Sequence, residues 1–431
     1  MDSTNFSIME KIFIASKIYG GIQKYFGHWE GLVDYNLDKV YQTLLKRILQ
    51  NDSRKDFILS LMEFIATLEN GHSWVNDKIL IEKYPPNLGF QFDFIENNWV
   101  ITFSYDKRFS PGTILEEING RSWESFYEEK KRFIGASSER AKRSSLTERP
   151  YLFPWEFTIS CRTPEGERIE KVINQEIVKN SKIKKAMNFE AKWLLNGQIG
   201  YISILNFGDP KIQKKALEWV EIFSNASSII FDLRGNIGGN TPIELISRLM
   251  KKKYRWWTET TPLKFSLHEF YFNYYDNMLQ NKELDKSTKI ELAENRSNFE
   301  IFAKPYLKWN SIWEAPLEDA YQGDIVILAD RNTRSAGEDF ILPFKDNKRA
   351  VIIGERTRGT TGQPYMIDCG KGLTVFIGMK RAYFPDGSPF EGIGIEPDVN
   401  IPLSIKLLQK RKESDDLVLQ TALEILKKNL N

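Results

Sequence analysis

The chain has 431 residues, of which 41% are hydrophobic and 27% are charged, so it is long enough for two or three domains with sizeable cores. Its 60 Lys and Arg residues nearly balance its 58 Asp and Glu residues, so the net charge gives no reason to expect nucleic acid as a partner. Its two cysteines, Cys161 and Cys369, are far apart and show no metal or redox spacing. We therefore expect two free thiols, no metal and no cofactor.

The N-terminal region has helical periodicity from Ser7 to about Leu80, which predicts an N-terminal helical domain over residues 1–82. The first residues lack a basic segment followed by a continuous apolar run, and no membrane span is predicted. The chain as given is therefore expected to be cytoplasmic, unless a signal peptide has been removed. Just beyond the last helical pattern, Gly71 and His72 stand where a glycine commonly ends a helix.

Short alternating runs follow at Leu88–Phe94 and Trp99–Phe103, and such runs are typical of strands. The next segment, Pro111–Gly120 (PGTILEEING), resembles the Gly-Asp-x-Ile-x-x-Ile-Asn-Gly core of PDZ domains. We therefore predict a PDZ-like β domain over residues 83–180. The resemblance implies that an extended peptide adds as a strand to an open sheet edge. A packed spacer without a peptide groove is the alternative.

The lysine-rich segment Lys182–Lys192 is expected to lead into a third domain, residues 181–405, with Ile199–Ile204 as its first strand. A second buried strand, Ser228–Asp232, ends in a turn that contains Gly238 and Gly239. Glycines in such a turn let backbone N–H groups approach a ligand closely.

An insertion dense in aromatic and charged residues lies between Arg255 and Tyr321. Two interpretations are left open for this insertion, residues 255–321. It could be a lid or substrate wall, or its aromatic side chains could contribute to the core or to contacts between copies of a homo-oligomer.

The all-apolar run Ile325–Ala329 precedes the segment Asp330–Glu338, a pattern that predicts a strand, a tight turn and the start of a helix. A hydroxyl on such a turn is exposed above the sheet, so Ser335 is the candidate nucleophile. The N–H group of Ala336 and the glycine turn upstream could together stabilise an oxyanion. The same Ser-x-x-Glu spacing also describes a helix capping box, and Thr333 is a second hydroxyl on the turn.

Downstream, the loop Phe384–Asp398 is punctuated by glycine and proline and carries the acidic residue Glu391. The last part of the chain, Asp415–Leu430, has apolar residues at helical spacing. We predict that residues 406–431 contain a C-terminal helix packed on the third domain.

The glycine turn, the Ser335 turn and the acidic loop, in this order, resemble the catalytic core of the C-terminal-processing protease and tricorn-core family of serine peptidases, from roughly Gln198 to Pro402. The resemblance implies an α/β multidomain fold with a crotonase-like core. In bacterial members of the family a lysine follows a Gly-Glu-x-Thr-x-Gly stretch and pairs with the serine. Here that stretch, Gly354–Gly359, is followed by Thr360, so this lysine is absent; Lys371 and Lys348 remain as alternative bases.

The tricorn-like branch of the family uses a histidine, and Glu69–Ser73 resembles its Leu-x-Asp-Gly-His-Ser/Thr motif. The resemblance implies that His72 is the base, that Glu391 orients it and that Ser73 is an auxiliary residue. His28 and His268 are expected to be structural or solvated. A carboxylate next to His72 is expected to raise its pKa above the ordinary value of about 6.5.

The implied function is that of a serine endopeptidase that cleaves peptides or unfolded protein segments through an acyl-enzyme. In this interpretation Ser335 attacks, while Ala336 and Gly238 or Gly239 receive the oxyanion. Because the lysine is missing, a catalytically inactive binding protein of the same fold is the alternative.

Overall fold

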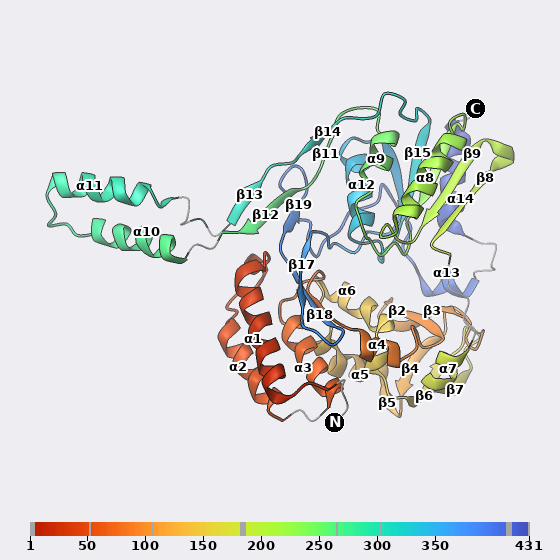
Figure 1. Ribbon diagram of the computed structural model, residues 1–431. Coiled ribbons are helices and arrows are strands. Elements are labelled where there is room, and N and C mark those ends of the chain that lie inside the picture. The colour runs from red at the N-terminus through yellow and green to blue at the C-terminus, as the bar shows by residue number, and fades with distance from the viewer. Residues whose placement is uncertain are drawn as a thin grey trace.

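The computed structural model describes residues 5–50, 53–105, 107–181, 187–263, 266–300, 304, 306–410 and 416–429. Residues 1–4, residues 182–186 of the predicted linker, and residues 415 and 430 of the predicted C-terminal segment lie outside the described residues. Figure 1 shows two adjoining bodies and an arm that projects from them. In the described part of the chain, no helix is long and apolar enough to cross a membrane.

Three capped helices form the N-terminal part of the first body. They are α1 (Ile8–Tyr25), α2 (Leu37–Ile48) and α3 (Arg54–Ala66). In each, the residue before the helix accepts a hydrogen bond from a backbone N–H of the first turn, which fixes where the helix begins.

The predicted helical domain, residues 1–82, is interrupted after α3. The segment that follows contains the strand β1 (Trp74–Asp77), and the short helix α4 (Lys78–Lys83) comes directly after this strand. β1 pairs antiparallel with β18 (Leu373–Gly378), which forms a hairpin with β17 (Pro364–Asp368). This pairing carries the segment just before β1, which includes His72, to the C-terminal half of the chain.

The second part of the first body is an antiparallel sheet with the order β2-β3-β4-β6-β7, and β5 pairs with β4. Its strands are β2 (Phe90–Ile95), β3 (Asn98–Ser104), β4 (Ile114–Ile118), β5 (Arg121–Ser122), β6 (Glu156–Arg162) and β7 (Arg168–Asn174). Three short helices accompany it: α5 (Trp123–Lys130), α6 (Glu139–Ser144) and α7 (Gln175–Asn180). One hydrophobic core joins this sheet to α1–α3 and to the β17–β18 hairpin.

The second body is built on a six-stranded sheet with the order β20-β16-β15-β10-β9-β8. Its strands are β8 (Phe189–Leu194), β9 (Ile199–Ile204), β10 (Ser228–Asp232), β15 (Asp324–Ala329), β16 (Ala350–Gly354) and β20 (Val399–Asn400). All neighbours are parallel except β8, which is antiparallel to β9. The prediction that Ile199–Ile204 is the first strand is therefore wrong by one strand. Edge strands commonly carry charged side chains, and this made β8 resemble a linker.

Helices cover both faces of this sheet. They are α8 (Pro210–Ile222), α9 (Ile243–Leu249) and α12 (Ala336–Asp346) on one face and α14 (Leu417–Asn429) on the other. Side chains alternate along each strand: Ile229 and Phe231 of β10 join the core under α8, α9 and α12, whereas Ile230 joins the core under α14. α14 lies within the segment for which a C-terminal helix was predicted, and its side chains pack on the sheet.

The aromatic-rich insertion contributes small sheets and a helical arm. Its elements are β11 (Tyr254–Arg255), β12 (Thr258–Pro262), α10 (Ser266–Leu279), α11 (Lys286–Ser297), β13 (Tyr306–Trp309) and β14 (Trp313–Glu314). Two elements later in the chain complete the structure, the strand β19 (Arg381–Tyr383) and the helix α13 (Ile405–Lys410). β12 lies between β13 and β19 in a three-stranded sheet, while α10 and α11 project away from both bodies (Figure 1). The two thiols are free, Cys161 being buried and Cys369 partly exposed.

Candidate active site

Ser335 lies at the start of α12, directly after the turn that follows β15. Its backbone has φ 54° and ψ −125°, a conformation that is uncommon for a residue with a side chain and that costs free energy. Thr333, the other hydroxyl of the turn, is fully buried; its Oγ1 donates to the carbonyl of Leu233 at 2.9 Å. Thr333 therefore holds the turn together, whereas Ser335 lines a cleft.

His72 comes from the first body and faces Ser335 across the cleft. Its Nε2 is 3.2 Å from Ser335 Oγ. The backbone N–H of His72 donates to Asn70 Oδ1 at 3.0 Å, and the Ser73 hydroxyl donates to the same oxygen, also at 3.0 Å. Ser73 Oγ in turn accepts the N–H of Gly378 in β18. Ser73 thus anchors the histidine segment on the β17–β18 hairpin, and its hydroxyl is engaged there.

Thr360 stands between His72 and Glu391, so the expected direct contact between the imidazole and the carboxylate is absent. His72 Nδ1 is 2.9 Å from Thr360 Oγ1, and Thr360 Oγ1 donates to Glu391 Oε1 at 3.0 Å. Because the Thr360 hydroxyl gives its own proton to Glu391, it accepts the Nδ1–H of His72. Gly71 makes this approach possible, since a Cβ there would lie 2.7 Å from Thr360 Oγ1.

Two further side chains donate to the same oxygen of Glu391. They are Ser137, which follows α5 and precedes α6, and Asn70, whose Nδ2 is 3.2 Å from Oε1. The Ser137 hydroxyl also accepts the N–H of Gly71 at 2.9 Å. The sequence offered no signal for Ser137, whereas Asn70 lies within the histidine motif Glu69–Ser73, at the position of its Asp. For Thr360 there was one indirect signal, because it occupies the place where the lysine was expected.

Glu338, in the first turn of α12, fixes the loop that carries Thr360. Its carboxylate accepts the hydroxyl of Thr357 at 2.5 Å and the N–H groups of Gly359 at 2.7 Å, Thr360 at 3.0 Å and Ser335 at 3.2 Å. It is fully buried. One side chain therefore sets the relative position of the candidate nucleophile and of the residue behind the candidate base.

Two backbone N–H groups next to Ser335 remain without partners among the described residues, those of Gly239 and Ala336. The N–H of Gly238 is engaged, because it donates to Asn236 Oδ1 at 2.8 Å. Gly238 is therefore wrong as an N–H donor to substrate. Its role is spatial: a Cβ at Gly238 would lie 2.6 Å from the Cβ of Ser335, so only glycine allows the two turns to meet.

The expected rise in the pKa of His72 is wrong. Burial, and secondarily the charge of Arg334, lowers the pKa of His72 to about 4, so the imidazole is neutral at physiological pH. Burial raises the pKa of Glu391 to about 7, against the opposing effect of the hydroxyls that donate to it. Desolvation thus outweighs the attraction between the two groups, partly because Thr360 keeps them apart.

The alternative lysines lie elsewhere. Lys371 is in the turn of the β17–β18 hairpin, where its Nζ contacts Glu10 at 2.9 Å and the carbonyl of Asn5 at 2.8 Å. Lys348 lines a separate cavity beyond the end of α12. His28 is buried and His268 belongs to α10, so His72 is the histidine that lines the cleft.

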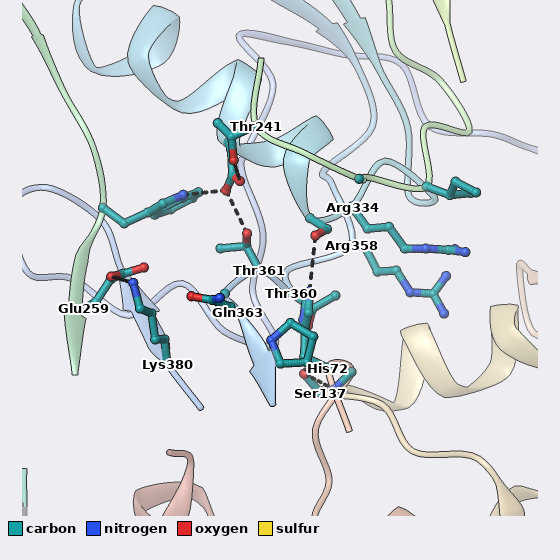
Figure 2. Close-up of a pocket in the computed structure, with 18 of the residues that line it drawn as sticks. His72, Ser137, Thr241, Glu259, Arg334, Arg358, Thr360, Thr361, Gln363 and Lys380 are labelled. Carbon is teal, nitrogen blue, oxygen red and sulfur yellow. Dashed lines mark hydrogen bonds and ion pairs between the residues drawn. The ribbon is translucent and has the colours of Figure 1, made fainter. Parts of the chain in front are cut away.

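The cleft has a volume of about 1050 Å³ and two different ends. Figure 2 shows Arg334 and Arg358 on one side of His72, with Glu259 and Lys380 on the other. The tryptophans of the insertion line the cleft as well, namely Trp256, Trp257 and Trp309. The insertion is thus a wall of the cleft, and Trp257 also joins the core of the second body, so each of the two interpretations holds in part, while the helical part points away. No cluster of His, Cys, Asp and Glu in the described ranges could hold a metal ion.

Residues 198–401, which contain Ser335, Thr360 and Glu391, match the model of peptidase family S41. This segment belongs to peptidase family S41.

Two curated relatives match parts of the chain. The C-terminal processing peptidase, chloroplastic, of Tetradesmus obliquus is 36% identical over 77 residues, which are 18% of this chain and 17% of that protein. The carboxyl-terminal-processing peptidase 2, chloroplastic, of Arabidopsis thaliana is 24% identical over 213 residues, which are 48% of this chain and 32% of that protein. The matches thus span no more than 32% of the length of these two relatives.

Solved structures resemble the chain over nearly its whole length. Mature CPAF superimposes with a TM-score of 0.65 at 14% identity, over 93% of this chain and 94% of that one. The photosystem II D1 C-terminal processing protease gives a TM-score of 0.53 at 14% identity, over 92% and 94% of the two chains. At this identity the likeness shows a shared mixed α/β fold.

Proposed function

We propose that the chain is a serine endopeptidase that cleaves peptides or unfolded protein segments through an acyl-enzyme. The single observation that carries the proposal is the 3.2 Å distance between Ser335 Oγ and His72 Nε2, two groups that are 263 residues apart in sequence. A serine needs an adjacent base to become a nucleophile, and a neutral imidazole within hydrogen-bond distance is such a base.

In this mechanism Ser335 Oγ attacks the carbonyl carbon of the scissile bond and its proton passes to His72 Nε2. The N–H groups of Gly239 and Ala336 donate to the resulting oxyanion, where one donor is worth roughly 3 kcal/mol. His72 gives the proton to the leaving amine, and a water then hydrolyses the acyl-enzyme with His72 again as base. The Nδ1–H of the imidazolium donates to Thr360, whose hydroxyl donates to Glu391, so the carboxylate acts on the base through a hydroxyl.

We extend the proposal to the architecture. The α/β body would be a crotonase-like core, and residues 83–180 a PDZ-like domain that follows the helical residues 1–82. Strand addition in that domain requires an open edge. At β2, the N–H of Phe92 donates to Thr147 and that of Phe94 to Asp93, which favours the spacer interpretation there. At β7 the opposite edge is largely exposed and remains the candidate for peptide pairing.

Cleavage of an unfolded protein such as reduced casein tests the proposed activity. Wild type is expected to cleave it, and Ser335→Ala is expected to have no activity while it folds normally. Thr333→Ala is the matched control on the same turn. If folded Thr333→Ala no longer cleaves casein and Ser335→Ala still does, the nucleophile is assigned to the wrong hydroxyl. If wild type binds casein and never cleaves it, the chain is the inactive binding protein of the alternative.

A further inference from the structure

We propose that Arg358 and Arg334 form a subsite that binds a carboxylate of the peptide substrate beside Ser335. This inference rests on the proposed peptidase function and adds the chemical class of substrate that the cleft prefers. The carboxylate can come from an aspartate or glutamate side chain or from the free C-terminus of the peptide, because both present the same planar pair of oxygens to a guanidinium.

The two arginines belong to the two backbone segments that build the site. Arg334 immediately precedes Ser335, and the backbone N–H of Arg358 donates to the carbonyl of Thr333 at 2.9 Å. Both side chains line the cleft. Figure 2 shows them next to each other on one side of His72, so a substrate group there would lie close to the reacting bond.

Arg358 has a buried donor with no acceptor in the protein. The residue is 6% exposed, and its Nη2 donates to the carbonyl of Ala141 at 2.9 Å and to the hydroxyl of Ser145. Its Nη1 is buried and has no hydrogen-bond partner among the described residues. A buried cationic donor left unpaired is unfavourable, and few are found in native structures. An acceptor that arrives with the substrate would complete the hydrogen bonding of this guanidinium.

This end of the cleft also carries excess positive charge. Three arginines line it, Arg149, Arg334 and Arg358, and Glu148 is the acidic residue that lines it with them. Glu148 accepts from Arg334 Nη1 at 2.9 Å, so it offsets one of the three charges. Burial and the neighbouring Arg334 lower the pKa of Arg358 to about 10, as expected for a guanidinium crowded by like charge.

At the other end of the cleft the charges are already satisfied. Lys380 pairs with Glu259 at 2.8 Å, and Asp339 accepts hydrogen bonds from Thr241, Thr361 and Trp257. A substrate carboxylate would gain nothing there. The cleft's excess positive charge therefore lies at the end where Arg358 has an unpartnered donor, beside Arg334, which pairs with Glu148, and we assign the carboxylate to that end.

The test compares kcat/KM for matched fluorogenic peptides. One pair differs only by Glu or Gln next to the cleaved bond, placed in turn on each side of it. The other pair has a neutral sequence that ends in a free carboxylate or in an amide. Wild type is expected to favour the acidic member of one pair by about tenfold or more, since hydrogen bonds to charged groups are the strong ones. The pair that shows the preference identifies the source of the carboxylate.

Arg358→Gln is expected to reduce that ratio to nearly one. Arg356→Gln is the matched control, because Arg356 pairs with Glu396 on the surface outside the cleft, and it should keep the wild-type ratio. Arg358 also bonds Ala141 and Ser145, so circular dichroism must show that the variant is folded. If it is not folded, Arg334→Gln decides, and it should lower the ratio several-fold.

Equal rates for both members of both pairs in wild type would overturn the subsite. A wild-type ratio that persists in folded Arg358→Gln would also overturn it. If Arg358→Gln does not fold, a ratio that persists in Arg334→Gln has the same meaning. Absence of cleavage of every peptide would instead contradict the proposed function. In that case fluorescence anisotropy of the same labelled peptides with wild type and the arginine variants still decides the subsite: tighter binding of acidic peptides that depends on Arg358 supports it, and equal binding refutes it.

Discussion

At the scale of single residues, the Thr360 hydroxyl is the contact through which Glu391 acts on His72. Ser335, His72 and Glu391 lie in one connected set of hydrogen bonds, although their catalytic roles stay proposals. The intermediary Thr360 was noted only as a missing lysine. Whether a residue fills the gap between two others depends on distances that a motif does not encode, so this part of the site required the structure.

Thr360 can be tested with a nearly isosteric change. Thr360→Val keeps the shape of the side chain but removes the hydroxyl that accepts from His72 Nδ1. We expect kcat to fall by about 10- to 100-fold, since positioned proton transfer contributes about that much or more. Thr360→Ser, which restores the hydroxyl, should recover most of the rate. Equal rates for the valine and serine variants would show that the hydroxyl has no part in catalysis.

The pH dependence should belong to Glu391. The pKa of His72 is lowered to about 4, so the base is already neutral above about pH 5, whereas the pKa of Glu391 is raised to about 7. Below pH 7 Glu391 is protonated and cannot stabilise the imidazolium, so kcat/KM is expected to rise through a single ionisation near pH 7. Glu391→Gln should be slower and lack this limb between about pH 5 and 8. Burial also raises the pKa of Glu338 to about 8, so a limb near pH 7 that persists in Glu391→Gln but disappears in the double variant Glu391→Gln/Glu338→Gln would belong to Glu338, and one that persists in both would belong to His72 and contradict the lowered pKa.

At the scale of elements, local patterns predicted the strands and helices that carry the nucleophile, while pairing between distant segments was missed. β15, the turn and α12 follow from an apolar run, a polar turn and an apolar helical pattern. β1 was predicted as helix, because four residues are too few to show alternation. Its partner β18 lies about three hundred residues further along the chain, and nothing local encodes that register.

The docking of the N-terminal helices on the β17–β18 hairpin gives a prediction with a matched control. A Cβ at Gly27 would lie 2.0 Å from the carbonyl oxygen of Met379, so Gly27→Ala is expected to destabilise the protein by about 1–3 kcal/mol. A Cβ at Gly20, inside α1, would have no atom within 4 Å, so Gly20→Ala should be neutral or stabilise by about 0.5–1 kcal/mol. Urea unfolding measures both. A Gly27→Ala protein as stable as Gly20→Ala would mean that the helices do not dock in this way.

At the scale of the whole molecule, the candidate site exists only because the parts of the chain meet. Ser335 and Thr360 belong to the α/β body, His72 follows α3, and Ser137 precedes α6. The core that α1–α3 share with the antiparallel sheet and the β17–β18 hairpin joins these segments into one packed body. Length predicted two or three domains, but the contact between distant parts of the chain is a property of the folded chain.

The helical arm is expected to be dispensable for the proposed chemistry. The contacts of the arm are largely internal, such as the Arg296–Asp276 ion pair at 2.7 Å. At its base, Pro262 of β12 lies opposite Tyr306 of β13. Because these two strands bring the ends of the arm together, a short Gly-Ser linker can replace α10 and α11. We expect the shortened protein to keep its unfolding midpoint and its peptidase rate.

Exposed aromatic side chains on α10, including Phe270 and Tyr274, make the arm our candidate for contacts in a homo-oligomer. Sedimentation of both forms tests that role, and an unchanged oligomeric state would exclude it.

The most direct test of the central claim is the site and rate of labelling by an alkyl fluorophosphonate, which bonds covalently only to an activated serine. Mass spectrometry of the digested protein is predicted to find one adduct per chain, on Ser335, formed rapidly in wild type and at least about 100-fold more slowly in His72→Ala. Ser335→Ala should carry none. A folded wild-type protein that stays unlabelled, an adduct on another serine, or a labelling rate unaffected by His72→Ala would contradict the account.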